Sequence, residues 1–454
     1  MITDHAAPGT QALHEQLAAR GVRYALASFV DMHGVSKAKS VPLGHLGQML
    51  RGSELFTGAA LDGVPQEVND EEVSARPDPA SAMVMPWHPE VAWFASDLYV
   101  GGEPFEACSR GILRRVMDEA ADMGYRCNLG VETEFYVLRE GPDGELLPAS
   151  SRDTLAKPCY DVRGLLDNYS WVSELVAAMD ELGWDVYSFD HEDGNGQFET
   201  DFMYSDALTM ADRVVFFRLM AGEIARRHGL FATFMPKPFA DRTGSGAHFN
   251  MSLADAESGD NLFADPDDPR GCGLSKLGYS FIAGILRHAP AVCALIAPMV
   301  NSYKRLVTRG NMSGLTWAPV QVSYGSNNRT NMLRIPLAGG RVECRAADIS
   351  TNPYLGAALI MAAGLEGVRE GLDPGEPHHE DMYGYTSAQL EEMGIRFLPR
   401  TLAEAVDGLE ADELARSVMG PVMHDAWVRF KRDEWEEYHT HVSDWERRRY
   451  LRMF

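Results

Sequence analysis

The sequence predicts an α+β protein, with a small β-rich domain over residues 1–105 and a larger α+β domain over residues 106–454. In the first part, two β-prone runs flank a turn-like tetrapeptide at residues 31–34, which indicates a hairpin. After residue 105 the pattern changes, because apolar residues over 112–123 recur at helical spacing. The length of 454 residues suits two or three domains.

Helices and short strands alternate through the larger domain. Helices are expected at 168–182, 207–228, 274–296 and 353–370, with a helix-rich stretch from about 401 onward. Strands are expected at 128–138, 184–190, 230–235, 246–253, 320–324, 331–336 and 341–345. Residues 52–89 contain several prolines and are interpreted as a long loop, which at this length is expected to have a function of its own.

The charge balance excludes several classes of function. With 41 basic and 66 acidic residues the chain carries a formal charge of −25, which repels nucleic-acid backbones. Runs of about 18 apolar residues and an N-terminal signal pattern are both absent, so we expect no membrane partner. The six cysteines form no C-x-x-C pair, which favours scattered core thiols and a cytoplasmic location.

Four glutamates in two segments are candidate ligands for a cation. Glu132 and Glu134 are two apart on an expected strand, so they point to the same face. Two adjacent anions in an otherwise apolar strand are unfavourable unless a cation lies between them. Glu192 and Glu199 flank a glycine-rich turn that can bring them together. The alternatives are a solvent-facing edge strand and an acidic surface loop.

A third and a fourth segment add further candidates. His248, Asn250 and Ser252 share one face of an expected strand, although a single histidine here is also typical of a hydrogen-bonded core residue. Glu343 alternates with two arginines. Five glutamates with one imidazole form a ligand set that suits Mg²⁺ or Mn²⁺. Two such ions would serve phosphoryl transfer.

Arginines are concentrated in about forty residues of this acidic chain, at Arg305, Arg329, Arg334, Arg341 and Arg345. Arginine grips carboxylate or phosphate with two donors at once, so the cluster indicates a site for an anionic substrate and a nucleotide phosphate. Structural ion pairs with the many acids are the alternative. The sequence contains neither a P-loop nor a dinucleotide-binding glycine motif.

Taken together, the motifs resemble the glutamine synthetase family, of the bacterial type I kind, over nearly the whole chain. They are, in order, Glu132-x-Glu134, His191-Glu192 through Gly196-Gln197-Phe198-Glu199, Met235-Pro236-Lys237-Pro238, Gly244-Ser245-Gly246-Ala247-His248, Asn301-Ser302-Tyr303-Lys304-Arg305, Asn328-Arg329, Arg334-Ile335-Pro336, Arg341-x-Glu343-x-Arg345 and Asn352-Pro353-Tyr354. The resemblance implies a β-grasp N-terminal domain, a catalytic domain with a curved antiparallel sheet and surrounding helices, and a dodecamer of two hexameric rings with active sites between subunits. It also implies that ATP phosphorylates the γ-carboxylate of L-glutamate and that an amine then displaces phosphate.

The family's residue roles can be carried over motif by motif. The resemblance implies one metal held by Glu134, Glu192 and Glu199, and a second held by Glu132, His248 and Glu343. It implies glutamate binding by Arg305, Arg345 and Gly244, phosphoryl contacts by Arg329 and Arg334, and ATP contacts by Arg341, Tyr204, Ser252 and Asn250. Asp62 resembles the aspartate that reaches the next subunit's site and helps to deprotonate the amine.

Departures from the family pattern bear on the amine. The stretch 308–316 is longer than usual, and Trp317 stands where glutamine synthetase proper carries a glutamate that attracts ammonium. Tryptophan packs against an alkyl group or holds an ammonium through its π face. Thr243 replaces the usual Asn before Gly-Ser-Gly, and Asn250 stands where many members have a second His. Tyr383 lies where some members are adenylylated.

We therefore expect a glutamate–amine ligase, with a small amine such as methylamine favoured. Ordinary glutamine synthesis with ammonia and a γ-glutamylpolyamine synthetase are the alternatives, and core packing is the alternative interpretation of Trp317. A catalytically silent relative is disfavoured because all six metal ligands are present. A guanidino kinase-like phosphotransferase is disfavoured by Asp62, Arg305 and Arg345.

Overall fold

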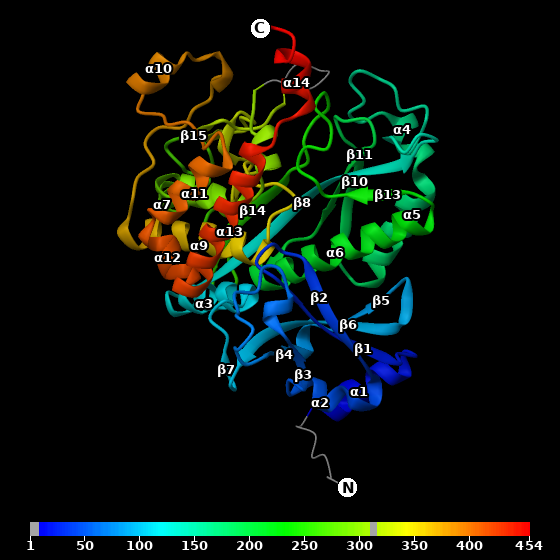
Figure 1. Cartoon of the computed structure of the whole chain (residues 1–454). Helices are drawn as coiled ribbons and strands as arrows, with labels where there is room; N and C mark the ends of the chain where they lie inside the picture. The colour runs from blue at the N-terminus through cyan, green and yellow to red at the C-terminus, as the bar shows by residue number, and fades with distance from the viewer. Residues whose placement is uncertain (1–8, 309–315) are drawn as a thin grey trace.

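Two β-sheets organise the molecule, and they come from different parts of the chain (Figure 1). The computed structural model describes residues 9–308 and 316–454. Within these residues, strands that precede residue 105 form a seven-stranded sheet, and later strands form a ten-stranded sheet. Helices accompany both sheets, so the predicted α+β class is confirmed.

The seven-stranded sheet has the order β2-β1-β6-β4-β3, and β5 and β7 also pair with β6. Its strands are β1 (Tyr24–Val30), β2 (Ser36–Pro42), β3 (Glu54–Phe56), β4 (Val73–Pro77), β5 (Met83–Met85), β6 (His88–Val100) and β7 (Glu103–Pro104). The predicted hairpin is confirmed, because β1 and β2 pair antiparallel. Leu17 of helix α1 (Thr10–Ala19) and Met49 of α2 (Leu46–Leu50) join Ala25 and Phe94 of the sheet in a small hydrophobic cluster.

The ten-stranded sheet has the order β10-β11-β8-β14-β17-β16-β15, and β9, β12 and β13 also pair with β8. Its strands are β8 (Tyr125–Glu140), β9 (Leu146–Pro148), β10 (Val186–His191), β11 (Gln197–Phe202), β12 (Ser205–Asp206), β13 (Phe231–Thr233), β14 (Ala247–Asp255), β15 (Gln321–Ser326), β16 (Asn331–Ile335) and β17 (Val342–Cys344). The expectation of an antiparallel sheet was wrong at one edge, where β15 and β16 run parallel. A strand alternates its side chains whichever way its neighbour runs, so the sequence pattern does not report this direction.

Helices surround the larger sheet. They are α3 (Ser109–Asp122), α4 (Val162–Asp167), α5 (Tyr169–Glu181), α6 (Ala207–Arg227), α7 (Lys276–Arg287), α8 (Ala289–Ile296), α9 (Pro353–Glu370), α10 (Ser387–Glu392), α11 (Leu402–Glu410), α12 (Glu413–Met419), α13 (Pro421–Thr440) and α14 (Asp444–Tyr450). The expected helix at 274–296 was wrong as a single element, because α7 and α8 meet at 79°. Pro290, in the first turn of α8, cannot continue the hydrogen bonding of a preceding helix.

Among the described residues, no single helix is long and apolar enough to cross a membrane. The bent α7–α8 pair has sufficient length and apolar composition, but this is a statement about length and composition only.

The expected loop at 52–89 was also wrong in part, because it contains β3, β4 and β5. Its prolines misled the interpretation, since two of them lie at strand ends. Pro77 is the last residue of β4 and Pro86 follows β5. Proline is tolerated at such ends, where its missing N–H breaks no inner ladder bond.

Strand β8 separates the core from the candidate site. Val131, Phe135 and Val137 alternate into the main hydrophobic core, where Phe135 packs edge-on against Phe217 of α6. Glu132, Glu134 and Tyr136, which alternate with these core-facing residues, point to the opposite face of the sheet. Because the core side is filled by large buried side chains, the backbone of β8 is held firmly beneath that opposite face.

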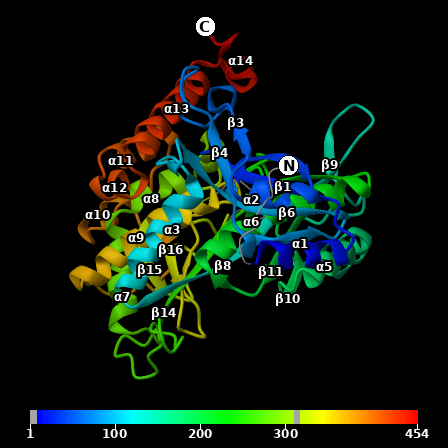
Figure 2. The same ribbon diagram turned by 90° about the horizontal axis from the view of Figure 1, so that it is seen from below.

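The first sheet packs directly against the larger part of the fold, as Figure 2 shows where β1 and β6 lie over α6. The rings of Trp87 and Trp93 contact Phe216 of α6 at centroid distances of 5.3 and 5.4 Å. The buried Arg110 guanidinium of α3, in the larger part, donates to the carboxylates of Asp97 and Asp78 in the first part at 3.0 and 2.9 Å. The contact between the two parts is therefore both apolar and ionic. The boundary near residue 105 stays a prediction.

A second ionic cluster joins helices of the larger part. His288, between α7 and α8, contacts Asp412 through Nδ1 at 2.7 Å and Glu366 through Nε2. Burial opposes the charge on this ring, but the hydrogen bonds to Asp412 and Glu366 outweigh burial and raise the pKa of His288.

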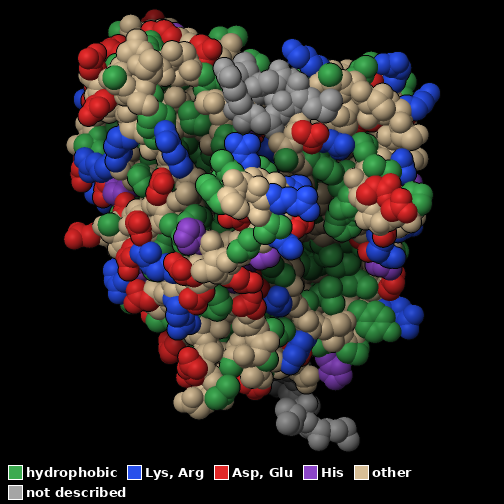
Figure 3. All heavy atoms as spheres, turned by 45° about the horizontal axis from the view of Figure 1, so that its top comes forward, with side chains coloured by type: hydrophobic (Ala, Val, Ile, Leu, Met, Phe, Trp, Pro, Cys, Tyr) green, Lys and Arg blue, Asp and Glu red, His purple; other side chains and the backbone are tan. Residues whose placement is uncertain are grey.

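On the face drawn in Figure 3, acidic and basic side chains are interspersed.

Candidate active site

Neighbouring strands of the ten-stranded sheet place acidic residues side by side. Glu134 of β8 is opposite Glu199 of β11, and Glu199 is opposite Asp190 of β10. Glu132, two residues before Glu134, is opposite His248 of β14. Residues directly opposite one another in adjacent strands project to the same face. The register therefore gathers these side chains above the face that is not covered by the core.

Glu134, Glu192 and Glu199 form one group, in which each offers an oxygen within 4.8 Å of the others. Burial raises the pKa of Glu134 and Glu192, and in Glu199 the neighbouring carboxylates Glu134 and Glu192 add to the effect of burial. The Gly246 N–H donates to Glu134 at 2.6 Å and fixes its position. Three carboxylates this close repel one another, and a divalent cation would remove that repulsion.

Glu132, His248 and Glu343 form the second group, again within 4.8 Å. Nδ1 of His248 lies 2.8 Å from Glu132 and 3.8 Å from Glu343. Burial, together with the nearby Arg345, lowers the pKa of His248 to about 3, so the imidazole is neutral and has a lone pair available for a metal. Asn250 donates to the other oxygen of Glu132 at 2.9 Å.

The donors of both groups fit hard divalent cations. Carboxylate oxygens predominate, with a single neutral imidazole, which is a set suited to Mg²⁺ or Mn²⁺ rather than to a softer metal. The structure thus brings together, in the same two groups, the six side chains that the sequence singled out.

Arginines also line this cavity, which has a volume of about 520 Å³. Arg305, Arg329, Arg334 and Arg345 all reach it. Arg334 and Arg345 both donate to the fully buried Glu343, so the same carboxylate serves the second acidic group and two arginines. Acidic and basic groups within one cavity suit a substrate that carries carboxylate, phosphate and bound cation together.

Two glycines make room for these side chains. A Cβ at Gly244 would lie 2.7 Å from Cγ of Arg305 and 2.7 Å from the Pro236 carbonyl oxygen. A Cβ at Gly246 would lie 2.8 Å from the Arg305 guanidinium. Arg305 itself is buried and donates to the carbonyls of Ala346 and Arg345 at 3.1 and 3.0 Å. Any larger residue at either glycine would therefore displace Arg305.

A second cavity of about 420 Å³ adjoins the first, and Glu132 lines both. Tyr204, Asn250, Ser252 and Arg341, which the sequence grouped as nucleotide contacts, all line it. Arg341 donates through Nε to Asn250 at 2.9 Å. The two cavities therefore meet at the second acidic group, between the arginines and the expected nucleotide contacts.

Trp317 and Asp62 lie in different places. Trp317 lines the first cavity, is 47% exposed and has a φ of 55°, which is unusual for a bulky residue. The alternative of core packing for Trp317 was therefore wrong. Beside it, the Tyr383 hydroxyl donates to the Ala318 carbonyl at 2.5 Å. Residues 309–315 of the unusual insertion lie outside the described residues.

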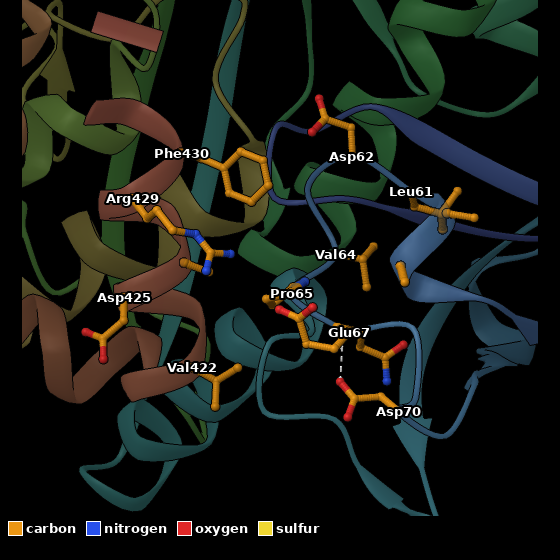
Figure 4. A pocket seen from close by; sticks show the side chains of 14 residues that line it. Leu61, Asp62, Val64, Pro65, Glu67, Asp70, Val422, Asp425, Arg429 and Phe430 are labelled. Carbon is orange, nitrogen blue, oxygen red and sulfur yellow. Dashed lines mark hydrogen bonds between the residues drawn. The ribbon is translucent and has the colours of Figure 1, made fainter. Parts of the chain in front are cut away.

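Asp62 is not brought to the cavity of its own chain. It lies in the loop after β3, with 81% of its side chain exposed, and lines a separate hollow of about 710 Å³ against α13. Figure 4 shows Asp62 and Phe430 facing each other across this region, from the loop and from the helix respectively. Among the described residues, the other sequence-predicted site residues line the two adjoining cavities, except Glu343, which is fully buried beside His248.

Several residues of the first cavity were not predicted from the sequence. Asp190 and Asp201 line it, and burial raises their pKa values to about 6 and 7, with help from Glu134 and Glu132 respectively. Asp201 is two residues after Glu199 on β11, so the alternation that revealed Glu132 could have revealed it too. Tyr160, whose φ is 62°, also lines the cavity. No pattern in the surrounding sequence predicts this position, because Tyr160 lies outside the regular strands.

The fold and this pair of cavities define a ligase of the glutamine synthetase type. Residues 106–450 match the family model for the glutamine synthetase catalytic domain. The chain belongs to the glutamine synthetase family and is, like other members, an ATP-dependent ligase.

Individual relatives cover nearly the whole chain. A glutamate–methylamine ligase of Methyloversatilis universalis is 45% identical over 95% of this chain and 97% of its own. A glutamine synthetase of Rhizobium leguminosarum bv. phaseoli is 40% identical over 94% and 96%. A solved GmaS–ADP complex superposes with a TM-score of 0.89 at 41% identity, over 97% of this chain and 99% of its own.

Proposed function

We propose that this enzyme joins the γ-carboxylate of L-glutamate to a small amine, with methylamine favoured, and releases ADP and phosphate. The observation that carries the choice of amine is Trp317, an aromatic side chain that lines the acidic and arginine-lined cavity. Its π face can hold an alkylammonium while its ring contacts the alkyl group. The similarity to a glutamate–methylamine ligase over nearly the full length supports the same choice.

The reaction needs an activated carboxylate. A free carboxylate does not react with an amine, because oxide would have to leave; transfer of the γ-phosphoryl group of ATP gives γ-glutamyl phosphate, whose leaving group is phosphate. Arg305, Arg345 and the space at Gly244 suit the binding of glutamate. Arg329 and Arg334 are placed to stabilise negative charge as it moves to the departing phosphate.

Two divalent cations, Mg²⁺ or Mn²⁺, are proposed at the two acidic groups. Glu134, Glu192 and Glu199 would hold one and Glu132, His248 and Glu343 the other. Bound there, such cations would supply positive charge that offsets the negative charge developing during phosphoryl transfer. ATP is proposed in the second cavity, with contacts from the residues that line it, namely Tyr204, Asn250, Ser252 and Arg341.

Asp62 is proposed as the base that takes a proton from the ammonium in the site of a neighbouring subunit. Its exposed position, away from the cavity of its own chain, supports a role in another copy. We accordingly propose a homo-oligomer with shared sites, a dodecamer of two hexameric rings. A cytoplasmic location is proposed as well, which agrees with six cysteines that are all unpaired.

Two other amines have specific support. Ammonia would make the enzyme a glutamine synthetase, and a relative of that name is 40% identical. A polyamine needs extra acids for its distant ammonium, and Asp190 and Asp201 line the cavity beside the acidic groups. Trp317 favours methylamine over both, because it offers an apolar contact and no carboxylate.

Steady-state phosphate release tests the proposal. With ATP and glutamate saturating, kcat/KM is measured for ammonia, methylamine, ethylamine and putrescine. We expect methylamine to have the highest value and release to require both glutamate and an amine. A kcat/KM for ammonia that is tenfold or more above that for methylamine would contradict the proposed role of Trp317. If no amine led to phosphate release, the proposed ligase activity would be wrong.

A further inference from the structure

The loop that carries Asp62 rests on the turn between β1 and β2. The Met32 N–H donates to the Gly63 carbonyl at 2.9 Å, directly beside Asp62. Gly63 has a φ of 79°, and a Cβ there would lie 2.7 Å from Cδ2 of His33. The imidazole of His33 therefore packs closely against this loop at Gly63, and only glycine fits there.

The turn is itself anchored to the larger part of the fold. The Asn352 amide donates to the carbonyls of Asp31 and Met32 at 3.0 and 3.3 Å. The ring of His33 meets Phe430 of α13 edge-on, at a centroid distance of 5.5 Å and an angle of 82°. His33 is thus held from two sides, whereas the neighbouring Asp62 side chain is 81% exposed.

One nitrogen of His33 is buried and unsatisfied. Nε2 has no hydrogen-bond partner among the described residues, and it lies 3.9 Å from a carboxylate oxygen of Asp62. A shift of about 1 Å by the exposed carboxylate would close this gap to hydrogen-bond distance. A buried donor without an acceptor is costly, so this geometry favours the closed arrangement.

The ring is uncharged near neutral pH. Burial and the adjacent Lys431 lower the pKa of His33, and they outweigh the opposing effect of Asp31, Asp62 and Glu434. A neutral imidazole orients a carboxylate by donating a hydrogen bond without neutralising its charge, so the carboxylate remains a base.

We propose that His33 is a positioning residue for Asp62: its Nε2–H donates to the carboxylate and holds it in the orientation that takes a proton from the alkylammonium. The inference rests on the proposed role of Asp62. In that step the carboxylate oxygen takes one N–H proton, and the freed lone pair of the amine attacks the γ-carbonyl carbon. The bond from this carbon to the phosphate oxygen then breaks; phosphate leaves with the electron pair and accepts the second N–H proton of the attacking nitrogen, which leaves the neutral amide. His33 keeps its proton throughout.

Two substitutions separate this role from simple packing. His33→Phe keeps an aromatic ring against Phe430 but removes the donor, whereas His33→Gln places an amide N–H near the position of Nε2. Hydroxylamine provides a second control, because it is uncharged at neutral pH and needs no proton removed before it attacks. A structural role would affect both nucleophiles alike, and a positioning role only methylamine.

The test measures kcat/KM for methylamine and for hydroxylamine in five forms of the full-length enzyme: wild type, His33→Phe, His33→Gln, Asp62→Asn and the double variant His33→Phe/Asp62→Asn. We expect His33→Phe to lower the methylamine value by about tenfold or more and the hydroxylamine value by less than about twofold. His33→Gln should recover most of the loss. The double variant should be no worse than Asp62→Asn alone, because the hydrogen bond acts only through that carboxylate.

Failure of the inference and failure of the proposed function give different results. The role of His33 would be overturned if His33→Phe lost equal activity with both nucleophiles or lost none with methylamine. It would also be overturned if the losses in the double variant were additive. Full methylamine activity in Asp62→Asn would instead overturn the proposed role of Asp62, whatever the His33 variants do.

Discussion

Replacing Trp317 with alanine is expected to lower the preference for methylamine over ammonia, measured as the ratio of their kcat/KM values. The exposure of the ring limits how large this change can be. The ring lines the cavity and about half of it is buried, so it can contact one methyl group of the substrate. Burial of one such group is worth about 0.8 kcal/mol, or about fourfold in kcat/KM. Loss of the π face removes a further 0.5–2 kcal/mol, roughly 2- to 30-fold, from methylammonium and ammonium alike.

Two effects should therefore appear together in Trp317→Ala. The kcat/KM values for both amines should fall, and the ratio of methylamine to ammonia should fall by about fourfold. Alanine is the suitable substitution, because it keeps the constraint of the left-handed φ of 55°, which glycine would relax. Both values come from phosphate release at saturating ATP and glutamate.

A matched variant, Trp317→Phe, keeps an aromatic face and should change the ratio by less than about twofold. The reasoning would be refuted if Trp317→Ala left the ratio unchanged, since the methyl group would then have no contact with the ring. It would be refuted equally by a larger ratio in the alanine variant.

Further consequences concern metal, assembly and stability. Glu134→Gln should abolish activity and weaken Mn²⁺ binding in calorimetry, and retained binding would remove Glu134 from the metal site. An equal mixture of inactive Asp62→Asn and Glu134→Gln subunits, dissociated and reassembled, should regain activity in about a quarter of its sites if sites are shared, and none if they are not. Arg110→Met should lower the free energy of unfolding by about 3–5 kcal/mol in urea, because the Asp212 carboxylate stays buried without its partner; an unchanged midpoint would contradict this. The pKa of His288 is raised on folding, so its contribution to stability is complete below the unfolded value of about 6.5 and is lost as pH rises through the folded value. The melting-temperature difference between wild type and His288→Gln should accordingly shrink with rising pH, and a difference that grows would contradict it.

The positions of site residues that follow from the alternation of one strand were predictable from the sequence. Positions that depend on how distant segments pair or pack were not. Glu132 and Glu134 alternate with core residues, so their common face followed from the strand pattern alone. Asp190 was not predicted as a site residue, because its place beside Glu199 depends on strand pairing. The bend before Pro290 escaped notice because the apolar pattern continues across it.

The division of the site between strands and loops explains how one chemistry can serve different amines. Glu134 is fixed by β8, whose next residue, Phe135, is fully buried in the core, so the acidic group cannot shift without disturbing the core. The proposed amine contacts, Trp317 and Asp62, lie instead on loops, where Trp317 is 47% exposed and the Asp62 side chain 81%. Substitutions there disturb the hydrophobic core less than changes in β8 would, because neither side chain belongs to it. Amine preference can therefore change at Trp317 while metal binding at Glu134 stays constant, as comparison of Mn²⁺ affinity in Trp317→Ala and wild type would show; a large loss of affinity there would mean that loop and strand are energetically coupled.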